Sequence, residues 1–316
     1  MIAESLSVVV PVYNSEHCLP ILVQRLAAML PTVAREFELI LVDDASRDGS
    51  GAVVDRVAEE HEWIAGIHLM RNFGQHNAVL YGIRNAQFEI IVTMDDDLQN
   101  PPEEIPRLLA KLSEGFDVVY GYPEHESHGL WRDFASRLTK RVLQAAMGVE
   151  VARHVSSFRA FRTQVRSAFM EYAGSFVSVD VLLSWGTSRF AAIPVKNPPR
   201  EIGASNYTAR KLILHAVNMI TGFSVLPLQL ASLLGFSFAV FGLCLLVMVL
   251  ARYVLEGDRV VGFPFLASAL SIFSGVQLFS LGIIGEYLAR MHFRLLNKPT
   301  YAIRSTTRKI CSARNS

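Results

Sequence analysis

Residues 90–99 read Ile-Ile-Val-Thr-Met-Asp-Asp-Asp-Leu-Gln, an apolar run that leads directly into three acidic residues. The run from Ile90 to Met94 is short, rich in β-branched residues and soon followed by Asn-Pro-Pro, which predicts a fully buried strand of a parallel sheet. Ligands bind beyond the carboxyl ends of such strands. Three adjacent carboxylates repel one another unless a cation lies among them, and hard oxygen ligands favour Mg²⁺ or Mn²⁺ shared with phosphates. The stretch therefore indicates a metal-dependent site for a nucleotide diphosphate, with a solvated acidic turn as the alternative.

The C-terminal third of the chain is unusually apolar. Hydrophobic residues make up 51% of the 316 residues and the mean hydropathy is +0.30, more than an ordinary soluble protein of this size carries. Residues 216–251 and 260–285 contain no charged residue, and each run exceeds the roughly 20 residues that a helix needs to cross a bilayer. We therefore predict two transmembrane helices within residues 224–289, joined by a short extracytoplasmic loop near 252–259. Two helices buried in a large soluble core are the alternative.

Charges on either side of this apolar region predict its orientation. Arg210 and Lys211 precede it, and the short loop balances two arginines with two acidic residues. The basic residues that follow it are Arg290, Arg294, Lys298, Arg304, Arg308 and Lys309. Because cytoplasmic segments carry the excess of Lys and Arg, the N-terminal domain and both termini are expected in the cytoplasm.

Other features exclude several classes of protein. The first residues lead straight into a short apolar segment without a basic stretch before it, so no signal peptide is expected. Cys18, Cys244 and Cys311 lie far apart and predict neither disulfides nor a zinc site. The net charge of +1, without interleaved basic and aromatic residues, gives no indication of nucleic-acid binding.

Short apolar runs alternate with helical patterns along the first 120 residues. The expected strands are Leu6–Val12, Phe37–Val42, Gly66–Leu69, Ile90–Met94 and Val118–Tyr120. The expected helices are Leu19–Leu30, Ser50–His61, Gln75–Ala86 and Glu103–Leu112. This alternation predicts an α/β fold with a mostly parallel sheet and helices on both faces. The N-terminal domain should span residues 1–207, with further helices at Trp131–Met147 and Val177–Trp185 and strands at Phe158–Phe161 and Phe190–Val195.

Two further segments flank the apolar region. Residues 208–223 mix basic and amide side chains with apolar ones, which is typical of a helix lying at the bilayer surface. Residues 290–316 form a basic cytosolic tail. The part after Pro299 is expected to be loosely ordered because Ser, Thr, Arg and Lys dominate it.

The ends of the first two expected strands carry polar side chains toward one crevice. Pro11 and Tyr13 end the first strand, and Asp43 and Asp44 end the second. An aromatic ring there can cover a nucleotide base, while a carboxylate can accept hydrogen bonds from a base N–H or from ribose hydroxyls. The Asp48-Gly49-Ser50 segment is better explained as a turn and helix cap.

Four motifs together resemble the family 2 glycosyltransferases, which have a GT-A fold. They are Pro-Val-Tyr-Asn (11–14), Val-Asp-Asp-Ala-Ser-Arg-Asp-Gly (42–49), Arg-Asn-Phe-Gly-Gln-His (71–76) and Asp-Asp-Asp-Leu-Gln-Asn-Pro-Pro (95–102). The resemblance is greatest to the enzymes that load a sugar onto a polyprenyl phosphate, and residues 275–290 are similar to the second span of the bacterial members. It implies a GT-A domain followed by a two-helix transmembrane hairpin in a bacterial inner membrane. By analogy, with Gly275, Gly282 and Gly285 as close-packing positions, it also suggests a homotetramer.

The resemblance also implies which residues bind the donor and the metal. Asp95, Asp97 and Gln99 would hold Mg²⁺ or Mn²⁺. Asp96 is expected to point away from the metal, because neighbours on an extended strand alternate sides. Residues expected to contact the nucleotide are Pro11, Tyr13, Asn14, Asp43, Asp44, Asn72, Asp95 and Asp96.

The implied reaction is attack by an oxygen of a polyprenyl phosphate on the anomeric carbon of a nucleotide sugar, with inversion at that carbon. The metal acts as a Lewis acid on the departing diphosphate, and the anionic acceptor has less need of a strong general base. The expected catalytic residues are Asp97, Arg132, Arg159 and Arg200, the arginines because a guanidinium binds phosphate oxygens in a bidentate fork. For Arg137 the expectation is a solvated helix face.

Three positions depart from the family pattern. Ser157 stands where an acidic residue often precedes Phe-Arg, and Tyr122-Pro123-Glu124 stands in place of an arginine-rich segment. Asn206 replaces the lysine of a Gly-x-Ser-Lys turn. Each departure alters the sugar or phosphate pocket, so the sequence leaves the base and the sugar open, including a deoxy- or amino-sugar.

Two alternatives to this reaction remain open. A processive polysaccharide synthase shares the GT-A start but normally carries Gln-x-x-Arg-Trp and more spans, which this sequence lacks. A membrane carrier or interaction protein of the same fold, without turnover, is suggested by Ser157 and Asn206. The intact Asp95, Asp97 and Gln99 argue against that second alternative.

Overall fold

The computed structural model describes residues 3–124, 151, 154–174, 177–198, 226–256, 263–296 and 299–307. The chain forms two compact units. Unit 1 comprises Met1–Ala216 together with Asn297–Ser316, and unit 2 is Val217–Leu296. The predicted helices at 131–147 and 208–223 lie outside the described residues.

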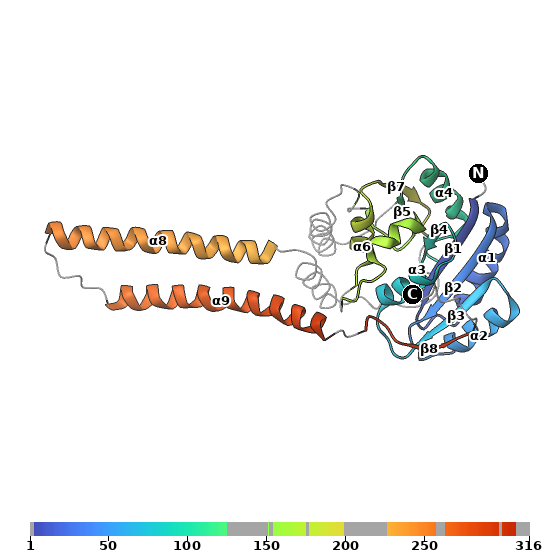
Figure 1. The fold of residues 1–316 in the computed structure, drawn as a ribbon, viewed down its shortest axis with the longest axis horizontal. Helices are drawn as coiled ribbons and strands as arrows, with labels where there is room; N and C mark the ends of the chain where they lie inside the picture. Colours follow the sequence, from blue (N-terminus) through green and yellow to red (C-terminus); the bar gives the residue numbers. More distant parts are fainter. Residues whose placement is uncertain are drawn as a thin grey trace. The chain divides into compact units, whose positions relative to one another are not determined.

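Unit 1 is built around a mixed sheet whose described strands are ordered β7-β5-β6-β4-β1-β2-β3-β8 (Figure 1). Strands β4, β1, β2 and β3 run parallel, and so do β5 and β7. Strand β6 is antiparallel to both its neighbours, and β8 is antiparallel to β3. The strands are β1 Ala3–Val12, β2 Ala34–Asp43, β3 Ile64–Leu69, β4 Ile90–Thr93, β5 Val118–Pro123, β6 Arg159–Arg162, β7 Phe190–Val195 and β8 Ile303–Thr306.

Helices connect these strands as the sequence predicts. They are α1 Leu19–Val33, α2 Ser50–Glu60, α3 Gln75–Asn85, the 3-10 turn η1 Pro102–Glu104, α4 Ile105–Ser113, the 3-10 segment η3 Thr163–Phe169 and α6 Val179–Gly186. The predicted α/β alternation is confirmed, and its strands and helices end within a few residues of their predicted bounds.

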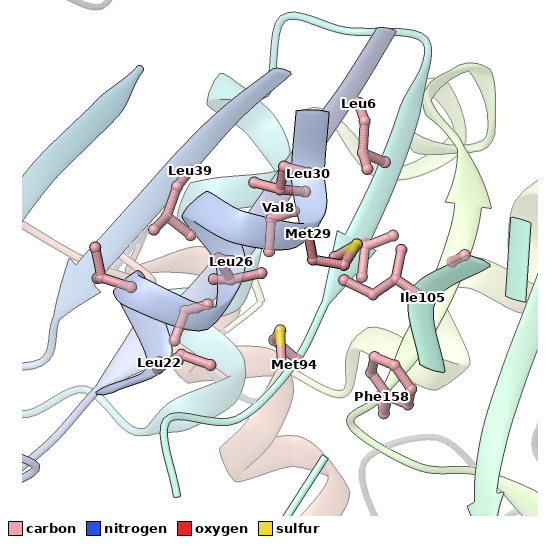
Figure 2. Packing of buried hydrophobic residues seen from close by; sticks show 14 of the residues in the cluster. Leu6, Val8, Leu22, Leu26, Met29, Leu30, Leu39, Met94, Ile105 and Phe158 are labelled. Carbon is pink, nitrogen blue, oxygen red and sulfur yellow. The ribbon is translucent and has the colours of Figure 1, made fainter. Parts of the chain in front are cut away.

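One large hydrophobic cluster of unit 1 lies between the sheet and helices α1, α2 and α4. Figure 2 shows Leu22, Leu26 and Leu30 of α1 directed toward strands β1 and β2, where they pack with Val8 and Leu39. These leucines recur every fourth residue, which places them on one face of the helix. All are fully buried, and each contributes about 2 kcal/mol of transfer free energy.

Strand β8 contradicts the expectation of a loosely ordered tail. Residues Ile303–Thr306 add an antiparallel edge strand to β3, flanked by hydrogen bonds from Met70 N to Ala302 O (2.8 Å) and from Thr307 N to Gly66 O (2.9 Å). An edge strand exposed on both faces needs no apolar alternation, so composition gives no sign of it. The backbone groups that β3 would otherwise leave unpaired supply the reason for its order.

Tyr301 anchors the segment that precedes β8. Its ring meets the Tyr81 ring edge to face at 4.9 Å between centroids. Arg84 donates to the Tyr301 hydroxyl (3.2 Å) and also to the carbonyls of Tyr172 (2.6 Å) and Phe169 (3.3 Å). One guanidinium on α3 therefore holds two chain segments that are far apart in the sequence.

The described residues of unit 2 form two helices, α8 Leu226–Glu256 and α9 Phe263–Leu295, which pack against each other (Figure 1). Phe238 and Phe273 meet edge to face between them, with centroids 5.8 Å apart. Both helices are long and apolar enough to cross a membrane. Only 6% of the apolar stretch Pro227–Cys244 in α8 and none of the stretch Ile272–Ala289 in α9 is buried. The core helix of a soluble protein would be mostly buried.

Replacing Tyr301 with alanine should destabilise unit 1 by about 2 kcal/mol, because the ring contact and the Arg84 hydrogen bond are both lost. The melting temperature of the detergent-solubilised protein measures this loss. Tyr301→Phe keeps the ring, so it should lose less than half as much stability as the alanine variant. Equal melting temperatures for the alanine variant and the wild type would show that the segment before β8 is not anchored here.

Candidate active site

The carboxyl ends of β1, β2 and β4 meet at one edge of the sheet because these neighbouring strands are parallel. Each strand is followed by a residue with a left-handed backbone: Asn14 (φ 54°), Ala45 (φ 55°) and Leu98 (φ 62°). In the described part of the chain they are the non-glycine residues with positive φ. Such backbones cost about 1 kcal/mol or more each, and they cluster at functional sites. The strain marks this edge as the candidate site.

Asp96 joins the loop after β4 to the loop after β1. Its Oδ2 accepts hydrogen bonds from the Tyr13 amide (3.1 Å) and from the Ser15 hydroxyl. Burial raises the pKa of Asp96 above its ordinary value, and the charge on Asp97 raises it further. The side chain therefore braces the loop that carries Tyr13.

Asp95 is directed to other partners. Its Oδ1 accepts from the Gln75 side-chain amide (2.5 Å) and its Oδ2 from the Ser157 hydroxyl (2.6 Å). Burial raises the pKa of Asp95 to about 6, with the charges of Asp97 and Asp96 adding to the effect. An ionised Asp95 beside these acidic neighbours is the environment that a bound cation would stabilise.

The oxygen donors at this edge fit a hard divalent cation. Asp95 and Asp97 supply carboxylates, and the Asp97 Oδ1 accepts from the backbone amide of Gln99 (3.1 Å). Within the described ranges, no three His, Cys, Asp or Glu side chains gather into a metal site. Mg²⁺ and Mn²⁺ are commonly held by one or two carboxylates together with substrate phosphates, so Asp95, Asp97 and Gln99 suit a metal that arrives with a diphosphate.

Asp44 shapes the loop before α3. Its Oδ1 accepts from the Phe73 amide (2.7 Å) and its Oδ2 from the Gly74 amide (2.8 Å), and the residue is only 2% exposed. Burial raises the pKa of Asp44. Gly74 has φ +95°, a conformation that favours glycine. Asp44 thus fixes the loop that contains Asn72, and its own predicted contact with the nucleotide stays a prediction.

Asp43 begins a chain of hydrogen bonds that runs through the buried His68 to the exposed Asp55. Its Oδ2 lies 3.0 Å from His68 Nδ1, while His68 Nε2 lies 2.9 Å from Asp55 Oδ1. The hydrogen bond with Asp43 raises the pKa of His68, against the effect of burial, and Asp55 adds to the rise. Burial by itself raises the pKa of Asp43, but hydrogen bonds from His68 and Ser46 bring it below its ordinary value. Both ring nitrogens face carboxylates, so an imidazolium fits this position best.

Arg159, predicted as a phosphate ligand, lies inside the sheet. It is 2% exposed, donates from Nε to Thr93 Oγ1 (2.9 Å) and pairs with Asp180. Tyr120 donates its hydroxyl to the same Asp180 carboxylate (3.2 Å). These contacts give Arg159 a structural role; a direct catalytic contact stays a prediction. Arg132 and Arg200 lie outside the described residues.

The other predicted nucleotide-binding residues lie along the same edge. Pro11 is buried within β1, whereas Tyr13, Asn14 and Asn72 are exposed. The Asn14 Oδ1 accepts from the Arg47 amide (2.8 Å), which joins the loops after β1 and β2.

The roles of several residues at this site were not predicted from the sequence. No functional role was predicted for Ser15 or His68, since single polar residues in loops or buried strands form no recognisable pattern. Ser46 and Gln75 stood within quoted motifs without a role, and Ser157 was noted only as a departure. Each has a partner 20 or more residues away in the sequence, so only folding reveals these contacts.

Comparison with known proteins defines the class of protein. Residues 7–170 match the family model described as glycosyl transferase family 2. Undecaprenyl-phosphate 4-deoxy-4-formamido-L-arabinose transferase of Shewanella sediminis is 35% identical over 301 residues, which cover 94% of this chain and 91% of the relative. The same-named enzyme of Yersinia enterocolitica is 36% identical over 303 residues, covering 95% and 93%. The molecule is a glycosyltransferase, and the chain belongs to family 2.

Solved structures support the fold. Glucosyl-3-phosphoglycerate synthase from Mycobacterium tuberculosis, in complex with Mn²⁺, UDP and phosphoglyceric acid, superposes with a TM-score of 0.51 at 19% identity. The match covers 69% of this chain and 76% of the synthase. The complex of that synthase with phosphoglyceric acid gives 0.52 at 18% identity, covering 69% and 78%. The predicted GT-A-type fold is thereby confirmed.

Arg159→Met should destabilise the protein by about 3–5 kcal/mol, because it leaves Asp180 buried without its ion-pair partner. The melting temperature and the yield of folded protein measure the effect. Removing the acidic partner at the same time, as in Arg159→Met with Asp180→Leu, should restore part of the loss. If Arg159→Met by itself melts like the wild type but has no turnover, Arg159 instead has the catalytic role.

The His68 network should make stability fall as pH rises. Because the pKa of His68 is raised in the folded state, its contribution is complete below the unfolded value of 6.5 and is lost as pH passes the folded value. The melting temperature of the wild type should therefore fall more than that of His68→Gln between about pH 6 and about pH 9. Parallel curves for the two proteins would rule out the raised pKa.

Proposed function

We propose that this protein transfers a sugar from a nucleotide diphosphate donor to a polyprenyl phosphate, most specifically undecaprenyl phosphate, with inversion at the anomeric carbon. The product is a lipid-linked monosaccharide for modification of cell-envelope glycans. The observation that carries the proposal is the extent of the similarity. Relatives named undecaprenyl-phosphate transferases match 94–97% of the chain, so the similarity includes both long apolar helices.

The site supports donor binding at the ends of β1, β2 and β4. Tyr13 is 39% exposed there and is available to cover a base. Asp95 and Asp97 would hold a divalent cation, which when bound neutralises charge on the departing diphosphate. An acceptor phosphate is already anionic at neutral pH, so the chain has no need to supply a strong base. Arg132 and Arg200 are the proposed partners of the phosphates.

For the donor we propose a nucleotide-linked deoxy- or amino-sugar. The relatives are named for 4-deoxy-4-formamido-L-arabinose, and that sugar heads the candidates. The hydroxyl of Ser157 donates a hydrogen bond to Asp95. With serine instead of an acidic residue at position 157, the proposed diphosphate site has an uncharged hydrogen-bond donor beside it. Mg²⁺ and Mn²⁺ are both compatible with the oxygen donors.

We further propose that α8 and α9 cross a bacterial inner membrane, with unit 1 and both termini in the cytoplasm. The basic residues around the apolar region support this orientation.

Helices α8 and α9 are also candidates for self-association. Between them lies a groove of about 450 Å³ lined by apolar residues and by Ser232, Gln277 and Ser280, and polar groups in a bilayer need hydrogen-bond partners.

Asp97→Asn should reduce transfer at least about 100-fold while leaving membrane insertion intact, because the carboxylate serves the metal rather than the fold. Purified protein in detergent is incubated with undecaprenyl phosphate, Mg²⁺ or Mn²⁺ and a panel of UDP-, GDP- and dTDP-sugars that includes UDP-4-deoxy-4-formamido-L-arabinose. The mass of the lipid is followed.

A metal-dependent gain of one sugar by the wild type supports the proposal. Addition of many sugars would favour a processive synthase. Donor binding without any product across the panel would favour the carrier alternative, and unchanged turnover of Asp97→Asn would refute the metal assignment.

A further inference from the structure

We propose that Ser157 and Gln75 are positioning residues that hold the Asp95 carboxylate in the orientation needed to bind the metal–diphosphate unit. The inference rests on the proposed function, since Asp95 is its metal ligand. Neither the acidic triplet nor any metal-ligand spacing in the sequence points to these two side chains.

The first support is the geometry at Asp95. Each carboxylate oxygen accepts one hydrogen bond, Oδ1 from Gln75 and Oδ2 from Ser157. The donors come from different elements, since Gln75 is the first residue of α3 and Ser157 lies two residues before β6. Two bonds from separate directions fix the plane of the carboxylate. Each oxygen keeps a second lone pair with which to meet a cation.

The second support is that both donors are themselves held in place. The Ser157 carbonyl accepts from Thr93 Oγ1 (2.7 Å), and the next residue, Phe158, is fully buried in the core. Met94, the residue before Asp95, is 1% exposed in the same cluster, and Figure 2 shows Met94 and Phe158 together in it. The core thereby sets the positions of both chain segments that meet at the Asp95–Ser157 bond.

The anchoring of Gln75 is similar. The two residues before it, Phe73 and Gly74, donate their amides to the buried Asp44 carboxylate. Asp44 thus places the start of α3, and α3 places Gln75. This gives Asp44 an indirect part in orienting Asp95.

The third support is the charge of the two donors. A carboxylate at position 157 would add another negative charge beside Asp95, Asp96 and Asp97. A lysine or arginine would neutralise Asp95 and compete with the metal for it. A hydroxyl and a carboxamide orient the carboxylate while leaving its charge for the metal. The serine at 157 is therefore well suited to fixing Asp95 at this site.

The test measures metal binding directly. Full-length protein in detergent is titrated with Mn²⁺ in the presence of UDP, and free Mn²⁺ is followed by electron paramagnetic resonance. Loss of a partner that orients a metal ligand typically weakens metal binding or activity by about 10- to 100-fold, so Ser157→Ala and Gln75→Ala should each weaken Mn²⁺ binding by about 10-fold. Ser157→Thr keeps the hydroxyl and should recover most of the affinity.

Ser156→Ala is the matched control, because the Ser156 hydroxyl accepts from the Phe158 amide (3.1 Å) rather than bonding Asp95. It should bind Mn²⁺ like the wild type, and all variants should melt within a few degrees of it. Wild-type Mn²⁺ affinity in Ser157→Ala would overturn the proposal. So would an equal loss in Ser156→Ala, or a loss that follows the melting temperature, since either indicates a structural effect only.

This readout is independent of the lipid acceptor. If the wild type binds Mn²⁺ with UDP, the two alanine variants bind it weakly and no donor yields a lipid-linked sugar, the positioning role stands and the proposed acceptor fails. If transfer occurs and the variants retain full Mn²⁺ affinity, the proposed function stands and the positioning role fails.

Discussion

The burial of carboxylates where three parallel strands end is the constraint on which the rest of this site depends. A buried carboxylate needs hydrogen-bond donors, and here the donors come from neighbouring loops. Asp96 accepts a hydrogen bond from the loop after β1, and Asp44 accepts one from the loop before α3. Asp43 is hydrogen-bonded to His68 of the next strand. The acidic residues at the sheet edge therefore hold the loops of the site together. Asp95 and Asp97 are the pair that we propose for a cation.

A second, separate set of buried charges serves the sheet itself. Strand β6 runs antiparallel between β4 and β5, and it brings Arg159 next to Asp180 and Thr93 beneath the site. Arg159 also lowers the pKa of Asp95, although burial and the acidic neighbours prevail over this effect. The molecule thus keeps a structural cation close to its acidic cluster without exposing it.

The segment after α9, residues Asn297–Ser316, returns the chain from unit 2 to unit 1. Strand β8 follows α9 in the sequence yet belongs to the sheet of unit 1, where Thr307 bonds Gly66 across 241 residues of sequence. The outer edge of β3 is therefore paired by a strand that follows unit 2 in the sequence. Such a distant partner is invisible to local patterns, and a polar edge strand has no apolar alternation to reveal it. This is why the order of residues 303–306 was not predictable.

The sequence by itself determined the α/β alternation, the two long apolar helices and the acidic edge at the end of β4, because these depend on local periodicity and composition. It also determined the family, through motifs such as residues 95–102. Only the tertiary structure decided which groups each acidic residue contacts. Asp95 and Asp96 are adjacent in the chain, but Asp95 accepts from Ser157 and Gln75 and Asp96 accepts from Ser15, and all three donors come from distant segments. A hydrogen bond between distant residues exists only when packing brings both groups within 3 Å or so, and that information lies in the folded core rather than in any one stretch of the sequence.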